Sequence, residues 1–178
     1  MFNAPILLVG AHADLGLALI KQLAPQATRL YLAARNPERL NALQSEIHQT
    51  TACRCDLYAF DAEALESHAD FYASLNPPPQ TVIVLFGGMG PGVGGTTSVT
   101  RLKELCFTNY LGAVTLLEVV AAQFESLPTK GGLIVGVSSV AGERGRKINY
   151  LYGSAKAGFT AYLSGLRARL FPSGHHVM

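Results

Sequence analysis

Apolar residues gather in short unbroken runs along the chain, with longer amphipathic stretches between them. A strand that is covered on both faces, as in a parallel sheet, reads as an apolar run of about four to eight residues. Four such runs and the stretch Thr51–Arg54 predict five strands, and His175–Met178 begins a further one. The predicted strands are Pro5–Gly10, Arg29–Ala34, Thr51–Arg54, Thr81–Phe86 and Gly132–Ser138.

Helical spacing of apolar residues fills the intervals between these strands. A regular alternation of strands and helices predicts an α/β fold, a doubly wound parallel sheet with helices on both faces. Its C-terminal strands are expected to be missing or incomplete, because the sequence stops where a sixth strand begins. The predicted helices are Leu15–Leu23, Pro37–His48, Asp61–Leu75, Arg101–Phe124 and Tyr150–Leu170.

Composition adds that one well-buried domain spans residues 1–178, since 49% of the 178 residues are hydrophobic and 15% are charged. A net charge of +2 gives no reason to expect a nucleic-acid partner. Cys53, Cys55 and Cys106 have no zinc or redox spacing, so we expect reduced thiols and no metal. Reduced thiols favour a cytoplasmic protein, and no signal peptide or membrane span is expected.

The turn from Gly10 to Gly16 joins the first strand to the first helix. Free backbone N–H groups and the helix dipole make this the place for a dinucleotide pyrophosphate, although two glycines can also serve a turn for structural reasons alone. His12 in this turn is interpreted as lying beside the backbone rather than as a metal ligand. The candidate cofactor-binding residues here are Gly10, His12, Asp14, Leu15 and Gly16.

Polar residues and glycines follow the next strands. Arg35 comes directly after the second strand, and no Asp or Glu lies between Thr28 and Pro37. An arginine there suits an adenosine 2′-phosphate, so NADP is favoured over NAD; the alternative is a solvated arginine heading a helix. At the expected tip of the third strand, Asp56 could bond adenine or cap a turn, with Leu57 beside it. The stretch Gly87–Gly95, including Gly88, allows close approach of a ligand or is merely flexible.

The strongest chemical pattern is Tyr152-x-x-x-Lys156, with Ser139 thirteen residues before the tyrosine. On a helix, Lys156 lies one turn beyond Tyr152 on the same face, roughly 6 Å from the phenol, and its charge favours the phenolate. The serine stands at a strand end and can bond the same carbonyl oxygen. This pattern is typical of proton transfer to a ketone or from an alcohol, although the tyrosine–lysine spacing also arises by chance. Asn109, mid-helix, faces either the site or solvent.

Across its whole length the chain resembles the short-chain dehydrogenase/reductase family. The resemblance rests on Val9–Gly16, where Val9 and Asp14 replace a threonine and a glycine, and loosely on Phe86–Gly90 after the fourth strand. It implies a Rossmann-like NAD(P)-binding domain and the tetrad Asn109, Ser139, Tyr152 and Lys156. Tyr152 would then be the general acid/base, Lys156 would assist it and bind the nicotinamide ribose, Ser139 would polarise the carbonyl and Asn109 would hold a relay water. Tyr152 and Lys156 thus also count as cofactor-binding.

The loop before Tyr152 is similar to the branch that reduces 2-keto intermediates of lipid-linked pentoses, such as decaprenylphosphoryl-ribose, so a sugar or lipid-linked sugar ketone or alcohol is an expected substrate. The resemblance also implies a homo-oligomer, assembled through Arg101–Phe124 and Tyr150–Leu170. Family members continue beyond the last residue here, so a C-terminally truncated member is expected. The alternatives are a catalytically impaired fragment and a non-enzymatic NADP-binding protein of the same fold.

Overall fold

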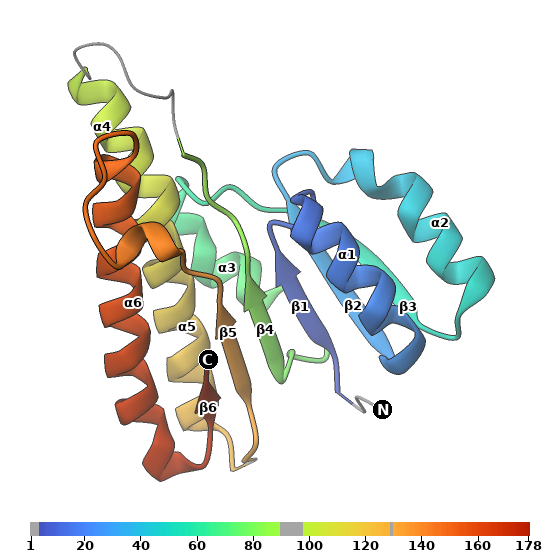
Figure 1. Cartoon of the computed structure of the whole chain (residues 1–178). Helices are drawn as coiled ribbons and strands as arrows, with labels where there is room; N and C mark the ends of the chain where they lie inside the picture. Colours follow the sequence, from blue (N-terminus) through green and yellow to red (C-terminus); the bar gives the residue numbers. More distant parts are fainter. Residues whose placement is uncertain (1–3, 90–97, 129) are drawn as a thin grey trace.

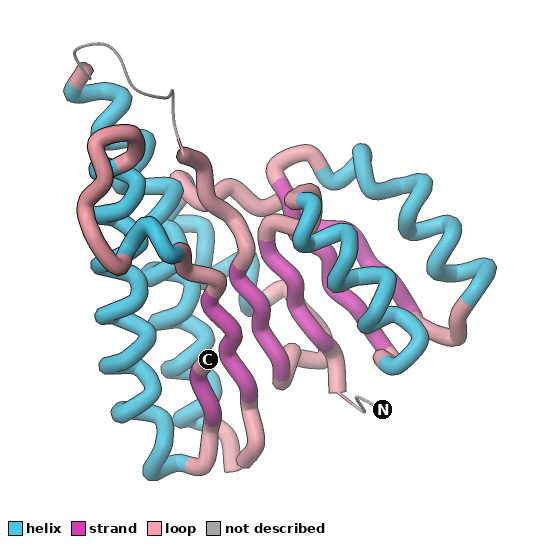
Figure 2. The backbone as a smooth tube through the Cα atoms, viewed as in Figure 1, coloured by secondary structure: helices cyan, strands magenta, loops and turns pink. Residues whose placement is uncertain are grey.

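A computed structural model describes residues 4–89, 98–128 and 130–178. Its centre is one six-stranded sheet in the order β3-β2-β1-β4-β5-β6, and every neighbouring pair is parallel. The doubly wound α/β fold is therefore confirmed (Figures 1 and 2). The strands are β1 Ile6–Val9, β2 Arg29–Ala34, β3 Arg54–Ala59, β4 Thr81–Val84, β5 Leu133–Gly136 and β6 His176–Val177.

Helices cover both faces of this sheet. Figure 1 shows α1 and α2 on one face and α3, α5 and α6 on the other. The α-helices are α1 Asp14–Leu23, α2 Asn41–Thr50, α3 His68–Ala73, α4 Val99–Cys106, α5 Gly112–Ser126 and α6 Tyr150–Leu170. Short 3₁₀ helices precede α2 (η2, Pro37–Leu40) and α3 (η3, Leu65–Ser67), and another, η5, spans Val140–Gly142.

Alternation along β1 divides the core into two layers, because successive strand side chains point to opposite faces. Leu7 and Val9 join a cluster with α5 and α6, whereas Ile6 and Leu8 join one with α1 and α2. All four side chains are completely buried. A strand covered on both faces reads as a continuous apolar run, which is why this part of the fold could be predicted.

The third strand is not where the sequence pattern placed it. Thr51 caps the end of α2, where its N–H and hydroxyl both donate to the Ile47 carbonyl at 2.9 and 2.8 Å. Pairing with β2 begins at Arg54, opposite Arg29, and runs to Ala59. The predicted bounds Thr51–Arg54 are therefore wrong: the strand begins only at Arg54, because Thr51 caps the end of α2.

The predicted helix Arg101–Phe124 is interrupted. A π turn, η4 Phe107–Leu111, lies between α4 and α5 and contains Asn109. By length and composition, Val99–Ser126 is apolar enough to cross a membrane, with a mean hydropathy of 1.6 in its most apolar window. Leu116, Leu117 and Val120 of this stretch are completely buried in the core. Burial of this kind is typical of a core helix.

Candidate active site

The loops at the carboxyl ends of the strands meet at one edge of the sheet, beginning with the β1–α1 turn. Gly10 has a φ of +89°, and a Cβ built on it would lie 2.6 Å from the backbone nitrogen of Phe86. A Cβ on Gly16 would lie 2.9 Å from the Ala11 carbonyl oxygen. Both glycines are therefore required by close backbone contacts. Helix α1 begins at Asp14 without a side-chain cap, so its first N–H groups are available to an anion.

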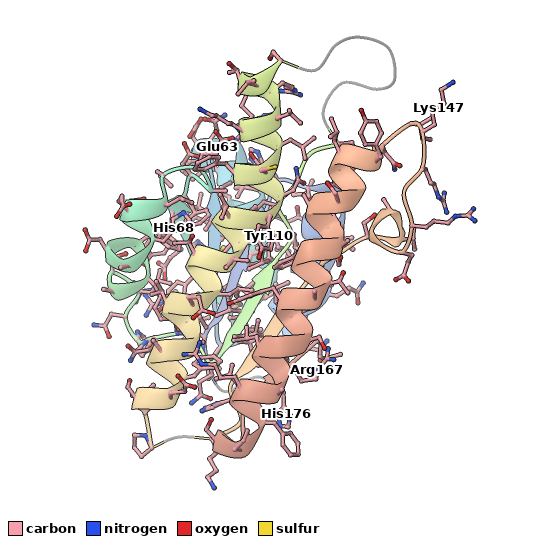
Figure 3. The ribbon with its side chains drawn as sticks, turned by 90° about the vertical axis from the view of Figure 1, so that its left-hand side faces the viewer. Glu63, His68, Tyr110, Lys147, Arg167 and His176 are labelled. Atoms are coloured by element: carbon pink, nitrogen blue, oxygen red, sulfur yellow. The ribbon has the colours of Figure 1, made fainter. Side chains whose placement is uncertain are left out.

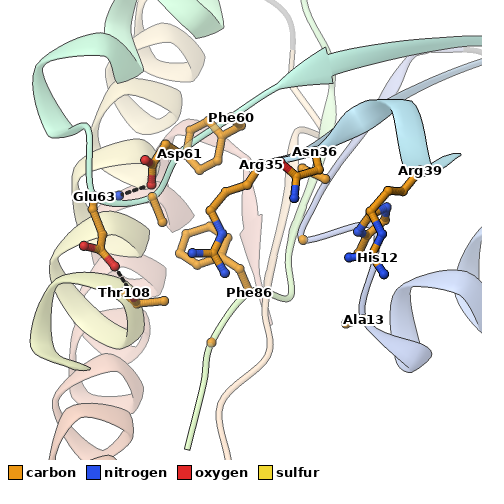
Figure 4. A pocket seen from close by; sticks show the side chains of 14 residues that line it. His12, Ala13, Arg35, Asn36, Arg39, Phe60, Asp61, Glu63, Phe86 and Thr108 are labelled. Atoms are coloured by element: carbon orange, nitrogen blue, oxygen red, sulfur yellow. Dashed lines mark hydrogen bonds between the residues drawn. The ribbon is translucent and has the colours of Figure 1, made fainter. Parts of the chain in front are cut away.

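A pocket of about 320 Å³ opens beside this turn (Figure 4). Of the predicted cofactor-binding residues, Gly10, His12, Arg35 and Gly87 line it. Gly88 lines a neighbouring pocket of about 460 Å³, which Arg35 and Gly87 also border. Sequence reasoning missed the other lining residues, which are Ala13, Ala34, Asn36, Arg39, Phe60, Asp61, Ala62, Glu63, Phe86 and Thr108.

Asp56 does not lie at the tip of the third strand. It lies within β3 opposite Tyr31, where its carboxylate accepts hydrogen bonds from Arg29 Nε at 2.7 Å and Arg54 Nε at 3.3 Å. Its neighbour Leu57 packs against the core layer beneath α1 and α2. Neither residue lines the pocket, and Asp61 occupies the strand exit that Asp56 was expected to hold. The misplaced strand boundary is the reason for this error.

Lys156 lies almost completely buried beneath Tyr152. Lys156 is only 3% exposed, and this burial lowers the pKa of its ammonium group. Its Nζ donates to the Val137 carbonyl at 3.0 Å and lies 6.0 Å from the centre of the half-buried Tyr152 ring. The one-turn spacing therefore places a cationic group next to the phenol ring.

The two candidate serines differ in what their hydroxyls do. Ser138 Oγ is within hydrogen-bond distance of Thr160 Oγ1, at 2.6 Å, and of the Lys156 carbonyl. Ser139 Oγ accepts from the Ala141 N–H at 3.1 Å, which leaves its own proton free to donate. Of the two, Ser139 is the hydroxyl that can still bond a substrate carbonyl.

Glycines hold the serine loop against α6. A Cβ on Gly142 would lie 2.9 Å from the Ala157 nitrogen, and a Cβ on Gly153 would overlap the Ala141 carbonyl. No side chain separates η5 from the first turns of α6. The loop that carries Ser139 and the helix that carries Tyr152 are consequently in direct contact.

Asn109 is 1% exposed and fastens the segment after β4 to the π turn. Its Oδ1 accepts from the Gly88 N–H at 2.9 Å, and its Nδ2 donates to the carbonyls of Gly88 and Leu105 at 2.9 and 3.0 Å. The solvent-facing alternative is therefore wrong. A Cβ on Gly87 would lie 2.8 Å from Asn109 Oδ1 and 3.3 Å from Lys156 Nζ, so these three residues meet.

Tyr110, next to Asn109, anchors the π turn to α6 (Figure 3). A Cβ on Gly158 would lie 3.3 Å from the Tyr110 ring. Asn109, Ser139, Tyr152 and Lys156 thus come from three segments that contact one another around η5 and α6.

The edge as a whole fits a nicotinamide dinucleotide. The turn has no room for a Cβ at Gly10 or Gly16, helix α1 begins there without a side-chain cap, and cationic side chains line the adjoining pocket. Nε2 of His12 is shielded from solvent and has no hydrogen-bond partner among the described residues. Within that part of the chain, no three His, Cys, Asp or Glu residues could hold a metal ion.

Beneath the pocket, His68 supports the exit of β3 (Figure 3). It is completely buried, stacks on Phe60 and lies with Nε2 3.1 Å from the Asp61 carbonyl oxygen. Since a carbonyl only accepts, Nε2 carries the proton. Burial lowers the pKa of His68, and the bond to Asp61 offsets this in part.

Stability should therefore fall in acid. As the pH drops through about 6.5, the unfolded chain binds a proton that the folded chain resists, so the free energy of unfolding decreases by at most about 1.4 kcal/mol per pH unit from this group. His68→Gln keeps a donor for Asp61 and cannot titrate. Urea unfolding between about pH 7.5 and about pH 5 should show a shallower loss for this variant. Equal losses in the two proteins would contradict the role given to His68.

Comparison with known proteins agrees with this arrangement. The sequence model of short chain dehydrogenases matches residues 4–178. An uncharacterized oxidoreductase of Mycobacterium tuberculosis is 35% identical over 174 residues, which cover 96% of this chain and 69% of the relative. An uncharacterized oxidoreductase of Streptomyces coelicolor is 32% identical over 181 residues, covering 97% of this chain and 69% of the relative.

Solved structures share the fold. The bulky-bulky ketone specific alcohol dehydrogenase from Comamonas testosteroni has a TM-score of 0.85 at 23% identity, over 100% of this chain and 72% of that one. A short-chain dehydrogenase from Sphingobium yanoikuyae in complex with NADPH has a TM-score of 0.82 at 23% identity, over 98% and 69%. The chain therefore belongs to the short-chain dehydrogenase family of NAD(P)-dependent oxidoreductases.

Proposed function

We propose that the chain interconverts a ketone and a secondary alcohol with NADP as cofactor. The observation that carries this proposal is the buried Lys156 ammonium 6.0 Å from the Tyr152 ring, at the edge where Gly87 and Asn109 also meet. A buried cation costs free energy unless it stabilises a negative charge. The phenolate that Tyr152 forms on giving up its proton is such a charge.

In the direction of reduction, Tyr152 donates its proton to the substrate oxygen while the free Ser139 hydroxyl bonds the same oxygen. Lys156 stabilises the resulting phenolate. A nicotinamide held at this site would supply the hydride. In the direction of oxidation the proton path runs in reverse. Asn109 holds the backbone of Gly88 in place, and a role in carrying protons through a water stays a prediction.

The dinucleotide would be held by the glycine turn at its pyrophosphate and by Arg35 at its 2′-phosphate, with Asp61 placed for the adenine amino group. Tyr152 and Lys156 would contact the nicotinamide ribose. The substrate is a small ketone or alcohol, and sugars and lipid-linked sugars are the first to test. We also propose a cytoplasmic homo-oligomer assembled through α5 and α6.

Arg35→Asp should shift the preference from NADPH toward NADH. The substitution removes a positive charge from the pocket and adds a carboxylate, which repels a phosphate and accepts a ribose hydroxyl. We expect the ratio of the two dissociation constants to change at least about tenfold, as loss of a charge-assisted hydrogen bond gives. Parallel titrations followed by nicotinamide fluorescence measure this ratio. Unchanged selectivity would contradict the role given to Arg35 in binding the 2′-phosphate.

The same titration on the unmodified chain tests the proposal as a whole. Saturable binding of NADPH with reduction of a ketone supports it. Binding without turnover on a broad panel of ketones would favour the alternative, a catalytically impaired or non-enzymatic NADP-binding protein. Absence of binding to either dinucleotide would contradict the cofactor assignment.

A further inference from the structure

A further pocket, of about 350 Å³, lies at the amino ends of the strands, the opposite edge of the sheet from the candidate active site. Because all neighbouring strands are parallel, their starts share this edge, which is the lower one in Figure 1. The volume is near the lower end of the range of about 300–1,000 Å³ that ligand pockets occupy. Among the residues that line this amino-end pocket, Pro5, Gln80, Gly132 and His175 stand directly before β1, β4, β5 and β6, and Phe124 and Leu127 lie at the end of α5.

One wall of the amino-end pocket is the proline run Pro77–Pro79, whose backbone is held by two tyrosines. The Tyr31 hydroxyl donates to the Pro77 carbonyl at 2.8 Å, and the Tyr72 hydroxyl donates to the Pro79 carbonyl at 3.3 Å. Proline has no backbone N–H, so this wall presents apolar rings and no donor. The wall is formed before a ligand arrives, which lowers the entropic cost of binding.

His175 gives the amino-end pocket a polar group with a defined proton. The residue is 3% exposed, and its ring stacks on Phe124 with 5.0 Å between the ring centroids. Its Nδ1 accepts from the Gly132 N–H at 3.1 Å, so in the neutral ring Nε2 carries the proton. Nε2 points away from Gly132, and its N–H has no acceptor among the described residues. A buried donor without a partner is costly, and it commonly marks a place where a ligand or water completes the bonding.

The charge of the lining residues indicates the class of ligand. None of those that the structure describes is Asp, Glu, Lys or Arg. The backbone N–H groups of Gln80, Leu127 and Gly132 already donate within the protein. An ionised ligand would therefore lose its hydration without gaining a counter-ion. An uncharged ring or short chain with one carbonyl oxygen avoids this loss and supplies the acceptor that Nε2 of His175 lacks.

We propose that the amino-end pocket is a second ligand site, for a small uncharged carbonyl compound. Its oxygen accepts from His175 Nε2, and its apolar body packs between the proline wall and Leu127. The site goes beyond the proposed function, because it is separate from the reacting groups. Gly87 and Ser139 follow the carboxyl ends of β4 and β5, whereas this ligand lies where the same strands begin.

The test follows binding of N,N-dimethylbenzamide to the chain 1–178 by NMR. This probe has an aromatic ring and a carbonyl oxygen but no charge, and it is not a ketone. We expect saturable shifts of the Gly132 and Leu127 amide signals, with a dissociation constant on the order of millimolar for so small a ligand. The Nε2 proton signal of His175 should move to lower field as it gains an acceptor. Benzoate, the charged counterpart, should bind at least about tenfold more weakly.

Three variants locate the site. Leu127→Trp should fill the amino-end pocket and weaken binding at least about tenfold; Leu127 is 36% exposed, so the larger ring leaves the core intact. His175→Asn keeps an acceptor for the Gly132 N–H and removes the Nε2 donor, so binding should weaken about threefold to tenfold, as for one hydrogen bond. His176→Asn changes the adjacent, exposed histidine, which does not line the pocket, and is the matched control that should bind like the wild type.

Absence of saturable shifts in the wild type would overturn the inference, as would binding that Leu127→Trp leaves unchanged. Equal affinity for benzoate, or unchanged binding by His175→Asn with normal thermal melting, would contradict the assigned ligand class. If His175→Asn does not fold, the Nε2 proton signal of the wild type decides whether that donor is used. None of these readouts involves NADPH or turnover, so the inference stands or falls independently of the proposed reaction.

Discussion

Tyr152→Phe is expected to lower kcat by about a hundredfold to ten thousandfold, the range over which a positioned proton donor contributes. The substitution removes only the hydroxyl and keeps the ring that lies 6.0 Å from Lys156 Nζ. Cofactor affinity should therefore stay within about twofold, because the remaining contacts of Tyr152 and the pocket are unchanged. Steady-state reduction of a ketone, together with NADPH titration of the same preparation, measures both quantities.

Tyr150→Phe is the matched control. Tyr150 is the first residue of the same helix and is 58% exposed, so losing its hydroxyl should leave kcat and folding unaffected. Turnover that survives in Tyr152→Phe would show that another group donates the proton. A loss of the same size in both variants would point to a disturbed helix end rather than to missing proton transfer.

Gly10→Ala is expected to destabilise the fold by about 3 kcal/mol and to abolish dinucleotide binding. Two causes add: the φ of +89° costs an L-residue about 1–2 kcal/mol, and displacing the Phe86 backbone from a Cβ only 2.6 Å away costs about as much again. Moving Phe86 also shifts Gly87, which contacts Asn109 and Lys156. Chemical denaturation and NADPH titration provide the two readouts.

Gly131→Ala separates these causes. Gly131 has a φ of +84°, and apart from its two chain neighbours no atom of the described residues lies within 4 Å of a built Cβ, so only the backbone strain applies. Its loss of stability should be about half that of Gly10→Ala, with cofactor binding retained. If the two variants lost equal stability, the close contact between the first turn and Phe86 would carry no energetic weight.

The order of strands and helices could be predicted because β1, β2 and β4 are buried on both faces and stand out as apolar runs. The Tyr152–Lys156 pair could also be placed, since helical spacing alone fixes it. These features depend on local periodicity.

The misjudged features depend on contacts between distant segments. Strand β3 contains the charged residues Arg54 and Asp56, which interrupt the apolar pattern expected of a buried strand. Asp56 is accommodated there by ion pairs with Arg54 and with Arg29 of the neighbouring strand β2. Asp61 could be recognised only once Ala59 was known to end the strand. Arg39 lies in η2, four residues beyond Arg35, and no short motif marks it as a residue that lines the pocket.

The π turn at Phe107–Leu111 amounts to one inserted residue in an otherwise continuous helix of the core. Each residue of an α-helix turns by about 100°, so α4 and α5 are out of phase by that amount. Deleting one residue would restore regular winding and rotate α4 about its axis together with Leu105. The helical phase of α4 relative to the sheet is thus set by a single added position, and a homologue that lacks this residue would have its site residues misassigned if it were aligned without a gap at this turn.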